Sequence, residues 1–87
     1  MKTTTTEGQI RESILTFILS AINIVDLDND DLLFQSGLAN SLFAVQLMTF
    51  LEKRFAITIE TDDLNIDNFQ SVNAATAFVM RKAVPTP

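Results

Sequence analysis

Residues 36–55, SGLANSLFAVQLMTFLEKRF, contain a turn of small residues followed by the pattern of a long amphipathic helix. Gly37 can adopt the positive φ angles that a Cβ disfavours, so it allows the backbone to turn sharply. Asn40 is a preferred helix N-cap, because its side-chain oxygen can accept a hydrogen bond from a free N–H of the first turn. We therefore predict a helix over residues 41–55, with Ser41 at its exposed start.

The predicted helix has two faces of different character. At 100° per residue, one broad arc is apolar and is expected to enter the core. This core arc contains Phe43, Ala44, Leu47, Met48, Phe50, Leu51 and Phe55. The opposite face contains Leu42, Val45, Gln46, Thr49, Glu52 and Lys53. Leu42 and Val45 are thus apolar residues on the face that the core does not need. Phe43 lies at the edge of the core arc.

Further helical segments surround this helix. Thr6 and Gln9 match a capping box that starts a helix over residues 7–22. The inward stripe of that helix is expected to contain Ile10, Ile14, Phe17, Ile18, Ala21 and Val25. Thr61 is expected to cap a short turn that leads into a brief third helix. Ser71 is expected to cap the last helix. Its inward stripe contains Val72, Ala75, Phe78 and Val79, and its last turn contains Arg81 and Lys82.

The expected fold is all-α, a four-helix bundle with a long first loop and a short third helix. Residues 23–39 lack a sustained period and form the long loop, and a connection of this length in a small domain is often functional. Its apolar anchors are expected to be Leu32, Leu33, Phe34 and Leu38. A chain of 87 residues is large enough for one such domain. We expect that domain to span residues 7–82, between flexible segments 1–6 and 83–87.

Composition excludes several classes of function. Eleven acidic and six basic residues give a net charge of −5, which opposes binding to nucleic acid. The chain has no Cys and no His, which excludes thiolate catalysis, imidazole acid–base catalysis and ordinary zinc ligation. The longest apolar run, residues 14–25, is interrupted by polar residues and is too short to span a bilayer. We therefore expect a cytoplasmic protein that does not bind membranes.

The acidic run in the long loop is similar to the beginning of a calcium-binding EF-hand loop. Asp26, Asp28 and Asp30 alternate as Ca²⁺ ligands do in that motif. However, Asp31 stands where the motif needs glycine, and Gly37 stands where it needs a bidentate Glu. We predict a solvated acidic loop that at most binds divalent ions weakly, and no metal site.

Ser41 stands where a phosphate group would be stabilised, because a helix N-terminus combines free N–H groups with a partial positive charge. An Asn cap followed by Ser also occurs in many unmodified helices. Residues 37–47, with Asn40, Ser41 and Leu42 at their centre, resemble the acyl and peptidyl carrier proteins, and the resemblance extends over residues 7–82. In that family the serine before the leucine is esterified with 4′-phosphopantetheine from coenzyme A.

The resemblance implies a substrate holder and not an enzyme. A phosphopantetheinyl transferase, with Mg²⁺ and coenzyme A, would use the Ser41 hydroxyl as acceptor, and the terminal thiol of the arm would carry an acyl group as a thioester. Residues 40–47, 63–64 and 68–72 are similar to freestanding carriers of hydroxymalonyl, methoxymalonyl and related extender units for polyketide and antibiotic biosynthesis. The implied partners are the transferase, acyl-loading and tailoring enzymes, and a polyketide synthase acyltransferase or ketosynthase. We expect the carrier to be a monomer.

The implied partner surface surrounds Ser41. It consists of Asn40, Leu42, Phe43, Val45, Gln46, Thr49, Glu52 and Lys53. Because the family has the position equivalent to Phe43 at the partner surface, we expect Phe43 to be partly exposed. Most carriers have Asp before the serine, whereas Asn40 caps the helix equally well but lacks the negative charge that the transferase usually meets. Glu52 is the one acid on this surface, so we expect partners to recognise shape and apolar contact more than charge.

Other functions are compatible with the same pattern. D-alanyl and other aminoacyl or peptidyl carriers share part of the helix pattern. Alternatively, an unmodified helical interaction module could dock a partner helix through Leu42 and Val45. A serine hydrolase is a poor account, because the chain has no His and a base such as Lys53 or Lys82 would have to reach Ser41.

Overall fold

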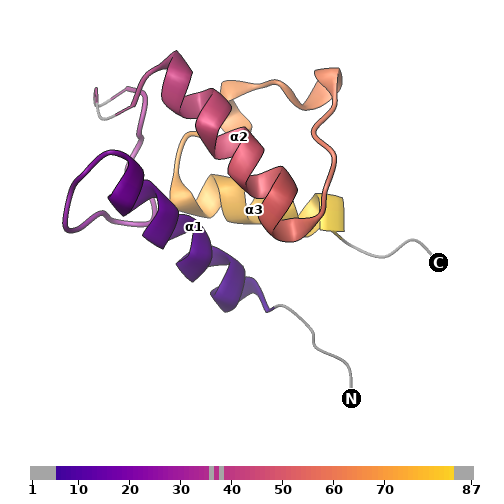
Figure 1. The fold of residues 1–87 in the computed structure, drawn as a ribbon, viewed down its shortest axis with the longest axis horizontal. Coiled ribbons are helices and arrows are strands. Elements are labelled where there is room, and N and C mark those ends of the chain that lie inside the picture. Colours follow the sequence, from indigo (N-terminus) through magenta and orange to yellow (C-terminus); the bar gives the residue numbers. More distant parts are fainter. Residues whose placement is uncertain (1–5, 36, 38, 84–87) are drawn as a thin grey trace.

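Three α-helices are present in the computed structural model, which describes residues 6–35, 37 and 39–83. They are α1 (Glu7–Ala21), α2 (Ser41–Phe55) and α3 (Val72–Ala83). Two single-turn 3₁₀ segments, η1 (Thr61–Asp63) and η2 (Ile66–Asn68), lie between α2 and α3. Helices α1 and α2 run antiparallel, and α3 packs against both (Figure 1). The all-α class is confirmed, but the described residues contain three α-helices and not four.

Helix α1 begins at the predicted capping box. The Thr6 hydroxyl accepts a hydrogen bond from the Gln9 N–H at 3.1 Å, and the Gln9 side chain accepts one from the Thr6 N–H at 2.9 Å. The predicted stripe of α1 is buried at Ile10, Ile14 and Ile18.

The prediction that Ala21 and Val25 face the core at the end of that stripe is wrong. Ala21 is exposed, and the side chain of Val25 is 97% exposed. The helix ends at Ala21, and Asn23 then takes a left-handed φ of 58°. This turn directs the chain away from the helix axis, so helical spacing no longer predicts which side of the chain faces the core.

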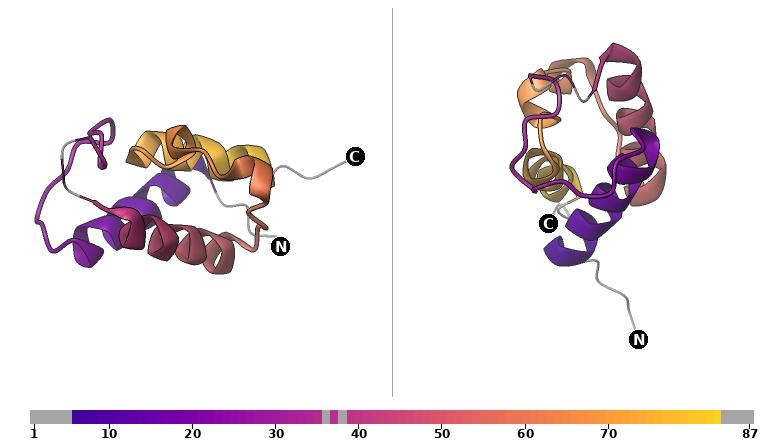
Figure 2. Two further views of the ribbon diagram at one scale, coloured as in Figure 1. Left: turned by 90° about the horizontal axis from the view of Figure 1, so that it is seen from above. Right: turned by 90° about the vertical axis from the view of Figure 1, so that its left-hand side faces the viewer.

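The long loop lies at the end of the molecule where α1 ends and α2 begins (Figure 2). It is attached to the segment around the start of α3 by two backbone hydrogen bonds. The N–H of Leu33 donates to the carbonyl of Gln70 at 2.7 Å, and the N–H of Asn73 donates to the carbonyl of Asn29 at 2.9 Å. Gly37 has a φ of +84°, as its place in the predicted turn requires.

The apolar anchors of this loop are only partly those predicted. Leu33 is buried and Phe34 is half-buried, but Leu32 is exposed and Leu38 lies outside the described residues. The carbonyl of Gln70 holds the Leu33 backbone, which favours one inward side chain and leaves its neighbour Leu32 in solvent. Leu27, which we did not predict as an anchor, is also buried.

The core forms where the three α-helices meet. From α2 it takes Phe43, Leu47 and Leu51, and α1 contributes its three buried isoleucines. The remaining buried apolar side chains are those of Leu27, Leu33, Ile57, Phe69, Val72, Ala75, Phe78 and Val79. The predicted inward stripe of α3 is therefore confirmed. The ring centroid of the buried Phe69 lies 5.0 Å from that of Phe78 in this stripe.

The segment between α2 and α3 differs from the prediction in two ways. A pair of 3₁₀ turns stands where the brief third helix was expected. Thr61 is the first residue of η1 and not its cap. Glu60 and Asp63 form a capping box there, in which Asp63 accepts a hydrogen bond from the Glu60 N–H at 2.9 Å.

The predicted cap of the last helix is confirmed, because Ser71 Oγ accepts a hydrogen bond from the Ala74 N–H at 3.0 Å.

The first and last helices lie near the two ends of the described part of the chain. Thr6 caps α1 and Ala83 ends α3, whereas the rest of the predicted flexible ends, residues 1–5 and 84–87, lies outside the described residues. Each helix in the described part of the chain is too short or too polar to cross a membrane.

Candidate functional site

Ser41 is the first residue of α2, and its side chain is exposed. The preceding residue, Asn40, has an extended backbone, and its Oδ1 accepts a hydrogen bond from the Phe43 N–H at 3.0 Å. This is the predicted N-cap. Among the described residues, no group forms a hydrogen bond with the Ser41 hydroxyl. The hydroxyl is therefore open to an incoming reagent.

The backbone around Ser41 provides an anion-binding position. The N–H groups of Ser41 and Leu42 have no hydrogen-bond partner in the described part of the chain, because the Asn40 cap takes only the N–H of Phe43. The first turn of α2 contains no acidic residue, and Lys53 and Arg54 lie in its last turn. The partial positive charge at the start of α2 is thus not neutralised locally, which favours a phosphate group bonded to Ser41.

The predicted outer face of α2 is open to solvent. Leu42 is 66% exposed and Val45 is 55% exposed. Asn40, Gln46, Thr49 and Lys53 are also exposed. The structure therefore leaves these residues accessible on one surface next to Ser41.

Phe43 departs from the expectation of partial exposure, because only 4% of it is exposed. The centroid of its ring lies 6.3 Å from the ring centroid of Phe17 in α1 and 6.4 Å from the ring centroid of Phe34 in the long loop. The loop and α1 thus close over a position that the helical wheel placed at the edge. Phe43 supports the start of α2 from inside and does not belong to the accessible surface.

Glu52 also has a structural role. It is half-buried, and its Oε2 accepts a hydrogen bond from the Ile59 N–H at 2.8 Å. This bond holds the segment after α2 against the helix. The surface around Ser41 thereby presents Lys53 as its charged residue.

A shallow groove runs along the molecule between α1 and α2. Its first hollow, of about 200 Å³, is lined by Ala21, Ile22, Ala39, Asn40, Leu42, Phe43 and Gln46. Its middle hollow, of about 560 Å³, is lined by Phe17, Ala21, Val45, Gln46, Thr49 and Phe50. Its last hollow, of about 740 Å³, is lined by Gln9, Glu12, Ser13, Thr16, Phe17, Ser20, Phe50 and Arg54. Neighbouring hollows share lining residues and therefore adjoin, and we call the three hollows together the α1–α2 groove.

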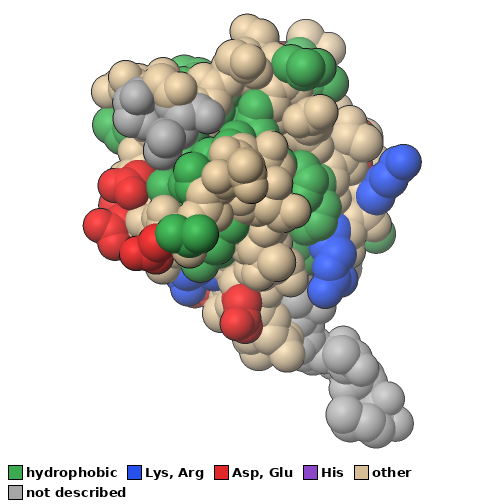
Figure 3. Space-filling view, turned by 60° about the vertical axis from the view of Figure 1, so that its left-hand side comes forward, with side chains coloured by type: hydrophobic (Ala, Val, Ile, Leu, Met, Phe, Trp, Pro, Cys, Tyr) green, Lys and Arg blue, Asp and Glu red, His purple; other side chains and the backbone are tan. Residues whose placement is uncertain are grey.

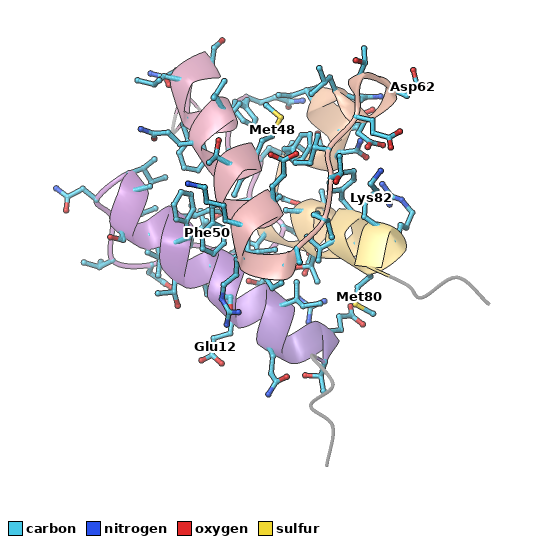
Figure 4. All side chains as sticks on the ribbon, turned by 45° about the vertical axis from the view of Figure 1, so that its right-hand side comes forward. Glu12, Met48, Phe50, Asp62, Met80 and Lys82 are labelled. Atoms are coloured by element: carbon cyan, nitrogen blue, oxygen red, sulfur yellow. The ribbon has the colours of Figure 1, made fainter. Side chains whose placement is uncertain are left out.

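The α1–α2 groove was not predicted. Figure 4 shows Phe50 between α1 and α2, with Glu12 on α1 nearby. The rings of Phe17 and Phe50 are stacked, with their centroids 4.3 Å apart and an angle of 11° between their planes. Both side chains are only half-buried. Helical spacing assigns both phenylalanines to core stripes. Their position at the rim depends on the distance between the two helices.

The acidic run of the long loop has structural roles. Asp30 accepts a hydrogen bond from the Asn73 side chain at 2.7 Å, and Asn73 in turn accepts one from Arg11 at 2.7 Å. Asp31 accepts a hydrogen bond from the Asp28 N–H at 3.0 Å. In the described part of the chain, no group of three or more acidic residues is arranged to hold a metal ion.

Charge is unevenly distributed over the molecule. In the view of Figure 3, acidic side chains gather at one edge, Lys and Arg lie mainly at the other, and apolar side chains lie between them. A partner that docks on this face would meet an apolar centre with charges of opposite sign on its two sides.

The sequence matches no protein-family model and none of the curated proteins with which it was compared.

Proposed function

We propose that this protein is an acyl carrier whose Ser41 is esterified with 4′-phosphopantetheine. The observation that carries the proposal is the free, exposed Ser41 hydroxyl at the first position of a capped helix. The acyl group would be a polyketide extender unit such as methoxymalonyl, used in the biosynthesis of a polyketide or a related secondary metabolite. A cytoplasmic location is part of this proposal.

The residues present suit the proposed group. A phosphodiester on Ser41 would lie beside the N–H groups of Ser41 and Leu42, which have no hydrogen-bond partner among the described residues, and no acid in the first turn would repel it. When bound, the group supplies a thiol that can hold an acyl group as a thioester. Asn40 orients the start of α2 and thereby the serine to which the group is attached.

The bundle is compatible with a carrier. The long loop leads directly to Ser41, and η1 and η2 occupy the part of the chain where a carrier-type four-helix bundle has its short third helix. In this interpretation the two 3₁₀ turns together are that third helix.

The partners would dock around Ser41 on the outer face of α2. They are the phosphopantetheinyl transferase, the enzymes that load and modify the acyl group, and a polyketide synthase acyltransferase or ketosynthase. Leu42 and Val45 provide apolar contact, and Gln46, Thr49 and Lys53 provide a polar border. Tethering would raise the effective concentration of the acyl group at each docked enzyme.

The protein itself is not proposed to be an enzyme. It has no His or Cys to act as base or nucleophile. Lys53 lies twelve positions after Ser41, in the last turn of α2, and Lys82 is paired with Asp63 at 2.8 Å. Neither lysine is therefore in position to activate the Ser41 hydroxyl.

Incubation of the apo protein with coenzyme A, Mg²⁺ and a broad-specificity transferase tests the proposal. Intact mass spectrometry should show the addition of one phosphopantetheinyl group to the wild type and none to Ser41→Ala. Ser20→Ala, which removes another exposed serine, should still be modified. Absence of the addition in the wild type, or its persistence in Ser41→Ala, would reject the proposal. The acyl mass on protein from its native producer would separate an acyl carrier from an aminoacyl carrier.

A second candidate is an unmodified interaction module, which is favoured by the exposure of Leu42 and Val45. This function predicts that Ser41→Ala binds its partner as tightly as the wild type, whereas Leu42→Ser and Val45→Ser weaken binding. The carrier function predicts instead that Ser41→Ala loses the ability to accept an acyl group.

A further inference from the structure

We propose that the α1–α2 groove is the resting site of the phosphopantetheine arm, and that Arg54 at its far end binds the free carboxylate of a malonyl-type acyl group. This inference rests on the proposed function. It adds to that function a binding site for the arm and for the free carboxylate of the proposed extender unit.

The groove begins beside the attachment point. Asn40 and Leu42, the two neighbours of Ser41 in the chain, both line its first hollow. Ala21 and Gln46 then line the first and middle hollows together. An arm that leaves Ser41 therefore has adjoining hollows beside it in the direction of the far end of α2.

The chemistry of the groove matches that of the arm. The arm alternates amide groups with short apolar segments. The stacked rings of Phe17 and Phe50, with Ala21 and Val45, offer apolar contact along the middle hollow. Gln46 and Thr49 line the same hollow, and their side chains can donate to and accept from the amides. Apolar walls with a few polar groups are typical of small-molecule sites.

The length of the loaded arm also matches the distance along α2 from Ser41 to Arg54. The arm has about fourteen chain atoms from phosphorus to sulfur, which at the dimensions of an extended peptide is roughly 16 Å. A malonyl group adds about 4 Å between the sulfur and its carboxylate at the same bond lengths. Arg54 lies thirteen positions after Ser41 in α2, and thirteen residues of helix rise about 20 Å. The carboxylate would therefore reach the level of Arg54.

Arg54 is available for a carboxylate. Its guanidinium lies over the ring of Phe55 at 5.5 Å, and it forms no ion pair with the described residues. A guanidinium can bind a carboxylate with two parallel hydrogen bonds. Glu12 lines the same hollow and would oppose a second negative charge, which weakens the Arg54 contact without removing it. Lys53, the adjacent cation, lines none of the three hollows and is the matched control.

NMR of isotope-labelled protein tests this inference. The transferase, supplied with Mg²⁺ and either malonyl-coenzyme A or acetyl-coenzyme A, transfers the acylated phosphopantetheine to the Ser41 oxygen and releases adenosine 3′,5′-bisphosphate. Intact mass confirms loading before any spectrum is recorded. Both forms should shift the signals of Val45, Thr49 and Phe50 relative to the apo protein, and the malonyl form should shift them more, because Arg54 holds the end of its arm. Only the malonyl form should shift the side-chain Nε signal of Arg54.

The variants separate the anchor from a general effect of charge. Arg54→Gln should abolish the difference between malonyl and acetyl forms in the middle hollow, whereas Lys53→Gln should preserve it. Glu12→Gln should enlarge the malonyl-specific shift of Arg54. If a fully loaded protein shows shifts confined to residues 40–43, or if Arg54→Gln behaves as Lys53→Gln, the inference is overturned while the carrier function stands. Failure to load at all would instead reject the carrier function.

Discussion

The two faces of α2 carry similar apolar residues in different surroundings. On the inner face, Phe43, Leu47 and Leu51 are almost completely buried against the other helices and the long loop. On the outer face, Leu42 and Val45 keep more than half of their surface in solvent. Burial on the inner face drives folding, because apolar area is removed from water there. The outer residues contribute little to folding, and their exposure beside Ser41 supports the proposed partner surface.

The largest expected difference between the faces is in stability. Leu47→Ala should lower the free energy of unfolding by about 2–5 kcal/mol, because it leaves a cavity at a fully buried position. Val45→Ala should change it by no more than about 0.5 kcal/mol. Urea denaturation followed by circular dichroism measures both values, since the chain has no Trp or Tyr for fluorescence. An equal loss in the free energy of unfolding for the two variants would mean that Val45 on the outer face is packed against other residues in solution.

A smaller effect is expected at the cap that both faces share. Asn40→Ala removes the acceptor of the Phe43 N–H and should cost about 1 kcal/mol of stability. Asn40→Asp should remain close to the wild type, because Asp is an equally good cap. The same denaturation experiment checks both variants. If Asn40→Ala leaves the free energy of unfolding unchanged, the core contacts of Phe43 alone hold the first turn of α2.

The smallest effect concerns the pair that ties η1 to α3. Figure 4 labels Lys82 on α3, whose Nζ lies 2.8 Å from Asp63 Oδ2. The hydrogen bond from Lys82, with that from the Glu60 N–H, holds the pKa of Asp63 below its ordinary value of 3.8. The same bond raises the pKa of Lys82 above its ordinary value of 10.5.

These shifts define a pH window. The contribution of Asp63 is present above its ordinary pKa and is lost as the pH falls through the lower folded value. The contribution of Lys82 is present below its ordinary pKa and is lost as the pH rises through the higher folded value. Asp63→Asn should therefore lower the urea midpoint modestly at pH 7, and the difference from the wild type should shrink below about pH 3.8. Asp62→Asn, the exposed neighbour, should match the wild type at both pH values.

The sequence alone determined the local features of this protein. Capping by Thr6, Asn40 and Ser71 depends on side chains that bond to backbone N–H groups three residues away, so it can be predicted without a fold. The bounds of α2 and the left-handed turn at Gly37 follow for the same reason. The position of Ser41 at the exposed start of a helix was therefore predictable.

Tertiary structure decided which apolar residues are covered. Phe43 is buried because Phe17 and Phe34, distant in the sequence, close over it. Val25 is exposed because the chain turns away after α1. The α1–α2 groove depends on the distance between two helices, which no periodicity encodes. Burial is a property of what packs from elsewhere in the chain, whereas capping is a property of neighbours along it.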